Sequence, residues 1–190
     1  IMNDKLGLPC EVVISDAMNH AWNLIQIDGE WYHVDATWDD PTWDSIGRVV
    51  HKYFLLSDTA ISDAEHKHHD WATTRTANST LYDTEYWSKI NSAFCYNQGT
   101  WYYSQYQEES SKTSLLKRNE LLSGTTEDVY TESSTWNKYG NSYMYLTKEN
   151  EAIYFNTPTA IKRLDADGTI TEVYKPTIPS GQVIFGFTVR

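Results

Sequence analysis

Two apolar and aromatic runs joined by Asp28-Gly29 constrain the fold of this chain more than any other feature. The runs span residues 20–27 and 30–38, and polar and apolar side chains alternate along both. Asp-Gly between two such runs favours a two-residue hairpin turn. With that turn, Ile27 faces Glu30, and the pairing of every other residue follows. The sequence therefore predicts an antiparallel hairpin in a defined register.

This register places a histidine and a carboxylate on one face of the hairpin. Trp22 lies opposite Asp35, and His20 projects from the same face because side chains along a strand alternate with period two. His20 and Asp35 are then diagonal neighbours, about 7–8 Å apart at the backbone. A histidine base and the carboxylate that orients it make up two members of a nucleophilic triad. We therefore predict that His20 and Asp35 are catalytic.

Other interpretations of the same hairpin stay open. A His and an Asp on paired strands are most often polar surface or core residues without a catalytic role. His33 lies on the same face and is an alternative partner for the carboxylate. A slip of one residue at the turn would place His20 and Asp35 on opposite faces. The catalytic prediction therefore depends on the Asp28-Gly29 turn.

Several separated blocks within residues 1–71 resemble the bacterial transglutaminase-like superfamily. In chain order, the blocks are Leu6-Gly7-Leu8-Pro9-Cys10, His20-Ala21-Trp22-Asn23, Asp28–Asp35, Thr37–Pro41 and Tyr53–Asp58. The resemblance implies a papain-like α+β fold with a Cys-His-Asp triad, in which His20 matches the base and Asp35 the orienting carboxylate. It does not select a substrate, because the superfamily contains transglutaminases, peptidases, amidases and non-enzymatic relatives.

The resemblance also implies that the nucleophilic cysteine precedes Ile1. Residues 1–6 are expected to be the last turns of the helix that this cysteine opens, closed by Gly7. Cys10 enters a β-branched run, whereas a reactive thiol needs a helix N-terminus or a nearby cation, so we expect Cys10 to be a small structural hydrophobe. Cys95 lies outside the region of resemblance. This chain alone is therefore expected to lack thiol-dependent activity.

Composition excludes some classes of function. The net charge is −11 and the 15 basic residues form no run, so nucleic-acid binding is not expected. No apolar stretch approaches the length of a membrane span. Two cysteines make no disulfide framework. The 14 Tyr and 8 Trp among abundant Ser, Thr and Asn indicate an extracellular or cell-surface protein.

A histidine-rich stretch at residues 65–71 raises the question of a metal site. It contains His66, His68 and His69 beside two acidic residues. Zinc ligands normally come from separated elements or from helical spacing, so we interpret this stretch as a solvated loop and predict neither a metal nor a cofactor. Residues 42–52 are expected to form a loop, residues 52–56 a short buried strand, and residues 72–92 a polar linker.

The second half of the chain contains an internal repeat. One copy spans about residues 93–130, a second spans about 142–175, and a third begins at 181. Each copy has strand-like runs separated by turn signals such as Asn97-Gln98-Gly99, and the spacing is typical of four-stranded propeller blades. Two copies cannot close a propeller, so they pack on the first domain or on each other, or further copies follow. An aromatic stripe is expected to fill the space between sheets, with a sugar- or peptide-binding platform as the alternative (Trp101, Tyr102, Tyr103, Tyr154, Phe155).

These observations predict an α+β chain. A transglutaminase-like or papain-like antiparallel domain spans residues 1–71, and an all-β, propeller-blade-like repeat module spans 93–190 after the linker. The predicted function is cysteine-dependent acyl transfer or amide hydrolysis on a peptide, protein or cell-wall substrate, with Trp22 and Trp38 lining the cleft. The alternative is a non-catalytic cell-surface binding or scaffold protein. Hydrolysis versus transfer, the substrate and the oligomeric state are left open.

Overall fold

The computed structural model describes residues 2–40, 47–107, 109–133 and 144–189 of the chain. Predictions that concern Ile1, residues 41–46, residues 142 and 143, and Arg190 lie outside these described residues. The chain forms two compact units. The first comprises Ile1–Pro41 and Val50–Lys89, and the second comprises Thr42–Val49 and Ile90–Arg190.

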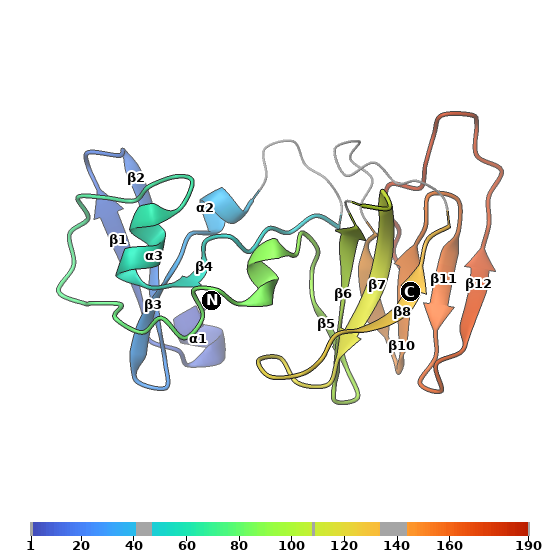
Figure 1. Cartoon of the computed structure of the whole chain (residues 1–190), viewed down its shortest axis with the longest axis horizontal. Helices are drawn as coiled ribbons and strands as arrows, with labels where there is room; N and C mark the ends of the chain where they lie inside the picture. Colours follow the sequence, from blue (N-terminus) through green and yellow to red (C-terminus); the bar gives the residue numbers. More distant parts are fainter. Residues whose placement is uncertain (1, 41–46, 108, 134–143, 190) are drawn as a thin grey trace. The chain divides into compact units, whose positions relative to one another are not determined.

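The first unit is built on a four-stranded antiparallel sheet (Figure 1). Its strands follow one another in chain order: β1 (Cys10–Ser15), β2 (His20–Ile27), β3 (Glu30–Val34) and β4 (Phe54–Leu56). Asp28 and Gly29 have φ angles of 51° and 88°, the two positive values that a type I′ turn needs. Ile27 faces Glu30. The register predicted from the Asp28-Gly29 turn is confirmed.

Short helices precede, interrupt and follow these strands in the chain. They are α1 (Met2–Leu6), α2 (Ala36–Asp39), α3 (Asp58–Asp63) and the 3-10 helix η1 (Tyr86–Lys89). At the end of α1, Gly7 has a φ of 67°, and its amide bonds to the carbonyl of Asn3 at 3.1 Å. Glycine adopts this left-handed conformation without the cost that a Cβ would bring, and so it ends the helix.

The core of the first unit joins the sheet to α3 and to the segment that follows. Its buried apolar residues come from β1, β2, β4, α3 and the segment after α3 (Val13, Trp22, Leu24, Leu56, Ile61, Ala77). Ala72 bridges to Ile14 of β1, and Ala77 and Trp87 are buried. Most of the segment expected to be a linker, residues 72–89, thus belongs to the first unit.

The second unit contains two four-stranded antiparallel sheets, each with its strands in chain order. The first sheet comprises β5 (Cys95–Asn97), β6 (Thr100–Gln107), β7 (Lys112–Arg118) and β8 (Glu127–Thr131). The second comprises β9 (Leu146–Glu149), β10 (Ala152–Asn156), β11 (Ile161–Leu164) and β12 (Ile170–Tyr174). Trp101 and Ile153 hold the same place, second in the second strand of each sheet. The two copies of the sequence repeat therefore have the same strand arrangement.

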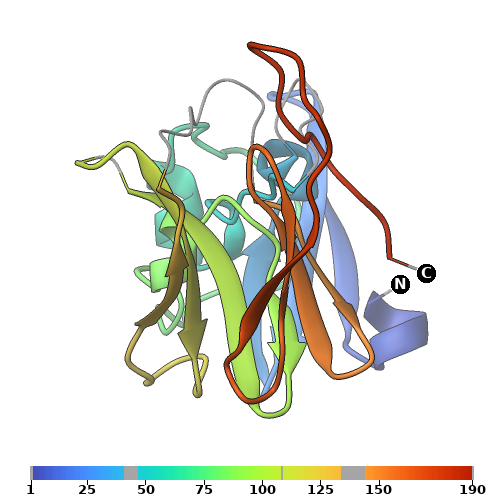
Figure 2. The ribbon, with the colours of Figure 1, turned by 90° about the vertical axis from the view of Figure 1, so that its right-hand side faces the viewer.

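The two sheets of the second unit bury an apolar core between them, and Figure 2 shows them as neighbouring twisted ribbons. Leu115 of β7 packs in this core with residues of the other sheet and its approach (Met144, Leu146, Ile153, Phe155, Leu164). Of the predicted aromatic stripe, Phe155 belongs to this core and Tyr102 packs against it, whereas Tyr103 is buried outside the cluster, with its ring centroid 5.1 Å from that of Phe94. Residues 181–187 form no strand in the described structure; the amide of Ile184 bonds instead to the carbonyl of Pro158 at 2.8 Å.

The prediction of an α+β fold with a transglutaminase-like or papain-like domain is wrong. The described residues form three antiparallel four-stranded sheets, and their α-helices are no longer than six residues. The expectation of helices came from the family resemblance, whereas the side-chain pattern along the chain has the period of two that strands require. Among the described residues, no helix has the length and apolar character needed to cross a membrane.

Candidate active site

Asp35 lies where β3 gives way to α2, and it is the N-cap residue of that helix. Its Oδ1 accepts hydrogen bonds from the amides of Thr37 at 3.0 Å and Trp38 at 3.2 Å. Aspartate is favoured at this position because its side chain satisfies amides that have no partner within the helix. The carboxylate is completely buried. With Oδ1 committed to the helix, Oδ2 is left for other donors.

His20, the first residue of β2, is one of the two residues that bind Oδ2 of Asp35. Its Nε2 lies 2.5 Å from the Asp35 Oδ2, so the side-chain contact predicted from the hairpin is present. The imidazole side chain is 13% exposed, and its Nδ1 makes no hydrogen bond to any described residue. The ring stacks on Trp22 at 5.6 Å between centroids. His20 is thus held at Nε2 and open at Nδ1.

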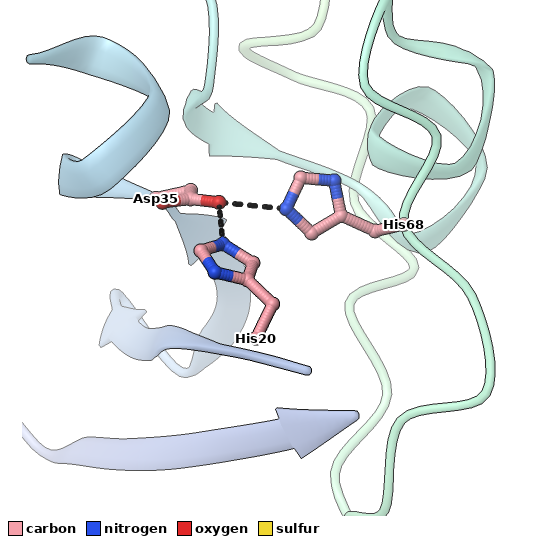
Figure 3. A group of neighbouring side chains, drawn as sticks. All are labelled: His20, Asp35 and His68. Carbon is pink, nitrogen blue, oxygen red and sulfur yellow. Dashed lines mark hydrogen bonds and ion pairs between the residues drawn. The ribbon is translucent and has the colours of Figure 1, made fainter. Parts of the chain in front are cut away.

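His68 binds the same oxygen from a distant part of the sequence. Its Nε2 lies 2.7 Å from Oδ2 of Asp35, and Figure 3 shows the two imidazoles converging on that atom. The His68 side chain is fully buried, whereas His66 and His69 on either side are exposed. The expectation of a solvated loop is therefore wrong for His68. The sequence signal for this residue was the histidine cluster itself, but local spacing does not show which member turns inward.

His33 does not contact Asp35 and belongs to a second buried network. Its Nδ1 accepts a hydrogen bond from the indole N–H of Trp22 at 2.8 Å, and its Nε2 lies 2.8 Å from Oδ1 of Asp58. Because an indole nitrogen only donates, Nδ1 of His33 carries no proton and Nε2 donates to Asp58. Burial lowers the pKa of His33 below its ordinary value, although the bond to Asp58 opposes this. Sequence reasoning missed this Trp22–His33–Asp58 network.

The pKa values of Asp35 and Asp39 are shifted in opposite directions. Burial raises the pKa of Asp35, but the hydrogen bonds from His68 and His20 outweigh it and hold that pKa below its ordinary value. Burial raises the pKa of Asp39 to about 7, despite the hydrogen bond from the Tyr53 amide. At neutral pH, Asp35 is therefore a carboxylate, and Asp39 is close to half-protonated.

The two predicted cleft tryptophans lie in different surroundings. Trp22 is buried and packs its ring against His20 and, edge-on, against His68 at 4.6 Å. Trp38 is 37% exposed; its ring lies 5.7 Å from that of His20 and stacks on His66 at 3.7 Å. Both tryptophans therefore border the ring of His20, one from the core side and one from the solvent side.

The strand register separates Cys10 from His20, and the environment of Cys95 does not favour a reactive thiol. In the β1–β2 pairing, Ser15 faces His20, whereas Cys10 faces Ile25 at the other end of the strand. Five residues of strand separate Cys10 from the position opposite His20, about 17 Å at the usual rise per residue. Burial raises the pKa of the Cys95 thiol, which disfavours the reactive thiolate.

The side chains of His20, Asp35 and His68 are also a donor set that transition metals accept. One ligand atom of each residue lies within 4.8 Å of the others. However, both Nε2 atoms point at Oδ2 at hydrogen-bond distance. Neither Nδ1 makes, within the described part of the chain, the outer hydrogen bond that metal-binding histidines usually have. The arrangement is that of a hydrogen-bonded His–Asp–His cluster.

Chemically, this cluster can take up and return a proton at Nδ1 of His20. Asp35 is ionised, accepts from the imidazole at Nε2 and stabilises the imidazolium that forms when Nδ1 is protonated. Comparisons of the chain with protein-family models, curated proteins and solved structures find no match. The function is therefore argued from the geometry of the cluster.

Proposed function

We propose that the His20–Asp35 pair serves cysteine-dependent acyl transfer or amide hydrolysis. His20 is the base, and Asp35 is the carboxylate that orients it. The observation that carries the proposal is the 2.5 Å contact between Nε2 of His20 and Oδ2 of Asp35, on a side chain that is partly exposed and whose Nδ1 has no hydrogen bond to the described part of the chain. A base needs one nitrogen tied and the other accessible to the reacting group.

In the first half of the reaction, Nδ1 of His20 takes the proton of a cysteine thiol. The thiolate attacks the carbonyl carbon of an amide, the C–N bond breaks, and the amine leaves with the proton from Nδ1. In the second half, Nδ1 takes a proton from water or from an acceptor amine, which attacks the thioester carbonyl carbon; the C–S bond breaks, and the released thiolate takes the proton back from Nδ1. Asp35 stabilises the imidazolium in both halves and stays ionised.

The thiol is proposed to come from outside residues 1–190. Cys10 is too far from His20 along the sheet, and Cys95 has a raised thiol pKa. The proposed substrates are peptide, protein or cell-wall amides. The resemblance to the transglutaminase-like superfamily stays a prediction, and the proposal does not depend on a papain-like fold because triads of this kind occur on unrelated folds.

The test compares two variants of the full-length protein on peptide amide substrates. His20→Ala is expected to lower turnover by several orders of magnitude, because it removes the base. Asp35→Asn keeps an oxygen to cap α2, but its amide N–H groups meet the N–H donors of both imidazoles. It is therefore expected to lower turnover by about 10⁴-fold without unfolding the helix.

A matched control separates catalysis from folding. His69→Ala removes an exposed histidine whose side chain bonds to Asp70, and it is expected to leave turnover unchanged. Thioester formation is followed by mass spectrometry of the enzyme after acid quench. Turnover in the His20→Ala variant equal to that of the His69→Ala variant would contradict the proposal.

A non-catalytic binding protein is the second candidate, and one observation in the second unit favours it. Tyr96 and Trp101 form a cross-strand pair with ring centroids 4.8 Å apart, and Tyr96 is 53% exposed. Exposed aromatic pairs are suited to stacking on sugars or peptide side chains. Binding of cell-wall oligosaccharide that is lost in Trp101→Ala, with no acyl-enzyme formed, would support this function over the first.

A further inference from the structure

We infer that His68 is a positioning residue, which holds the Asp35 carboxylate by donating a second hydrogen bond to the oxygen that binds His20. The inference deepens the proposed function and rests on it. It concerns a residue 33 positions beyond Asp35, on the loop that follows α3. The proposed action of His68 on the reacting imidazole runs through Asp35, although the rings of His68 and His20 are also neighbours, with centroids 5.7 Å apart.

The surroundings of His68 hold its ring in place. Its amide bonds to the carbonyl of Ile61 in α3 at 3.3 Å. Its ring packs edge-on against Trp22 and lies 5.9 Å from the ring of Tyr53. The side chain has no exposed surface. A fixed imidazole of this kind can set the position of a neighbouring carboxylate.

The tautomer of His68 follows from its buried nitrogens. Nδ1 is buried and has no hydrogen-bond partner among the described residues. A buried N–H without an acceptor is unfavourable, so the proton is expected on Nε2, where Asp35 accepts it. His68 is therefore a neutral donor. For the same reason, it is a poor proton acceptor in the reaction.

With His68 in place, the hydrogen-bonding capacity of Asp35 is filled. Oδ1 accepts from two backbone amides, and Oδ2 accepts from two imidazoles. A carboxylate offers about four acceptor positions. Asp35 then has no free lone pair with which to take the proton from His20. The second donor on Oδ2 also limits how strongly Asp35 attracts a proton to His20, which keeps His20 available as a base.

The titratable groups that face this cluster come from several elements. Asp39 from α2 and Tyr53 beside β4 both interact with the charge of Asp35, and His33 of β3 interacts with His68. None of them donates a hydrogen bond to Oδ2 in the described structure. The effect of removing the His68 donor is therefore expected at His20, the other group bound to that oxygen.

The experiment compares two substitutions of His68 in the full-length protein. The side-chain amide of Gln reaches about as far as Nε2 of His, so His68→Gln keeps a donor to Oδ2. His68→Phe keeps a ring against Trp22 but has no donor. His69→Gln serves as the exposed control. Two quantities are measured: kcat/KM as a function of pH, and the pKa of His20 by NMR titration of its imidazole signals.

We expect His68→Gln to stay within about threefold of the parent protein. His68→Phe is expected to lower kcat/KM by about 10–100-fold, the usual effect of losing an outer hydrogen-bond partner of a functional side chain. It is also expected to raise the pKa of His20, because the ionised Asp35 then interacts more strongly with the imidazolium. The acid limb of the pH profile should move to higher pH by the same amount.

Each outcome decides one point. An unchanged His20 pKa and unchanged kcat/KM in His68→Phe would overturn the inference. The NMR titration needs no turnover, so it tests His68 even if the parent protein shows no acyl transfer and the proposed function fails. If His68→Phe does not fold, His68→Asn replaces it, because its amide is one methylene too short to reach Oδ2. A His20 pKa equal in the Asn and Gln variants would overturn the inference as well.

Discussion

The two units of this protein differ in whether they bury histidine side chains. The first unit holds all six histidines of the chain and buries His33, Asp35 and His68 in its interior. The second unit contains no histidine, and the core between its sheets is made of aliphatic and aromatic side chains. Buried polar groups are costly unless their hydrogen bonds are complete, whereas apolar burial stabilises without such conditions. The second unit also buries polar side chains, Arg118 and Glu132 among them, but its inter-sheet core cluster is apolar, whereas the buried histidines and Asp35 of the first unit form its candidate site.

The largest loss of stability in the first unit is expected from Asp35→Leu. The substitution removes the cap of α2 and the shared acceptor of two imidazoles, leaving donors unpaired in the interior. We expect the free energy of unfolding of the first unit to fall by about 3–5 kcal/mol, the range for a buried charged network that loses one partner. Urea denaturation followed by the NMR amide signals of Leu24 and Leu115 would report each unit separately. A loss below about 1 kcal/mol at Leu24 would contradict the prediction.

In the second unit, a comparable effect requires a change in packing. Leu115 is fully buried between the sheets, and Leu115→Ala is expected to cost about 2–5 kcal/mol through lost burial and the cavity it leaves. This cost should be the same at pH 5 and pH 8, because the described residues of that core cluster include no histidine and no carboxylate. The same urea experiment at both pH values measures it. A cost that differs by more than about 1 kcal/mol between the two would break the contrast between the units.

The first unit should respond to pH through His33. Its folded-state pKa is below the ordinary value, so its contribution to stability is complete above about pH 6.5 and is lost as the pH falls through the folded-state pKa. Protonation of Nδ1 would also place two N–H groups, of His33 and Trp22, against each other. We expect urea midpoints at the Leu24 signal to fall on acidification from pH 7 to pH 5 in the Asp39→Asn variant, in which the opposite pH dependence of Asp39 is absent. The Leu115 signal serves as the internal reference.

Asp39 should change the stability of the first unit with pH in the direction opposite to His33, over part of the same pH range. Its pKa is raised to about 7, so its contribution is present below about pH 4 and is lost as the pH rises through 7. Asp39→Asn keeps an oxygen for the Tyr53 amide and removes the charge. It is expected to stabilise the first unit by roughly 1–3 kcal/mol at pH 8 and to have little effect at pH 4. Equal stabilisation at both pH values would show that the carboxyl does not titrate in this range.

Part of the fold could be read from short stretches of sequence. The Asp28-Gly29 turn predicts the register of β2 and β3, and Gly7 predicts the end of α1, because both depend on backbone conformations that few residues adopt. The α+β expectation failed because it came from similarity of separate motifs. Their order along the chain does not determine how much helix surrounds them.

In the candidate site, too, some features follow from the local sequence and others only from the tertiary structure. The sequence by itself determined that His20 and Asp35 share a face, because strand periodicity and turn type are local properties. Only the tertiary structure decided that His68, one of three clustered histidines, turns inward to Asp35 while its neighbours stay in solvent. That choice depends on the path of the loop after α3 and on the space beside Trp22. In the second unit, tertiary packing likewise decided that the two repeats cover each other, since each sheet has an apolar face that only another sheet can bury.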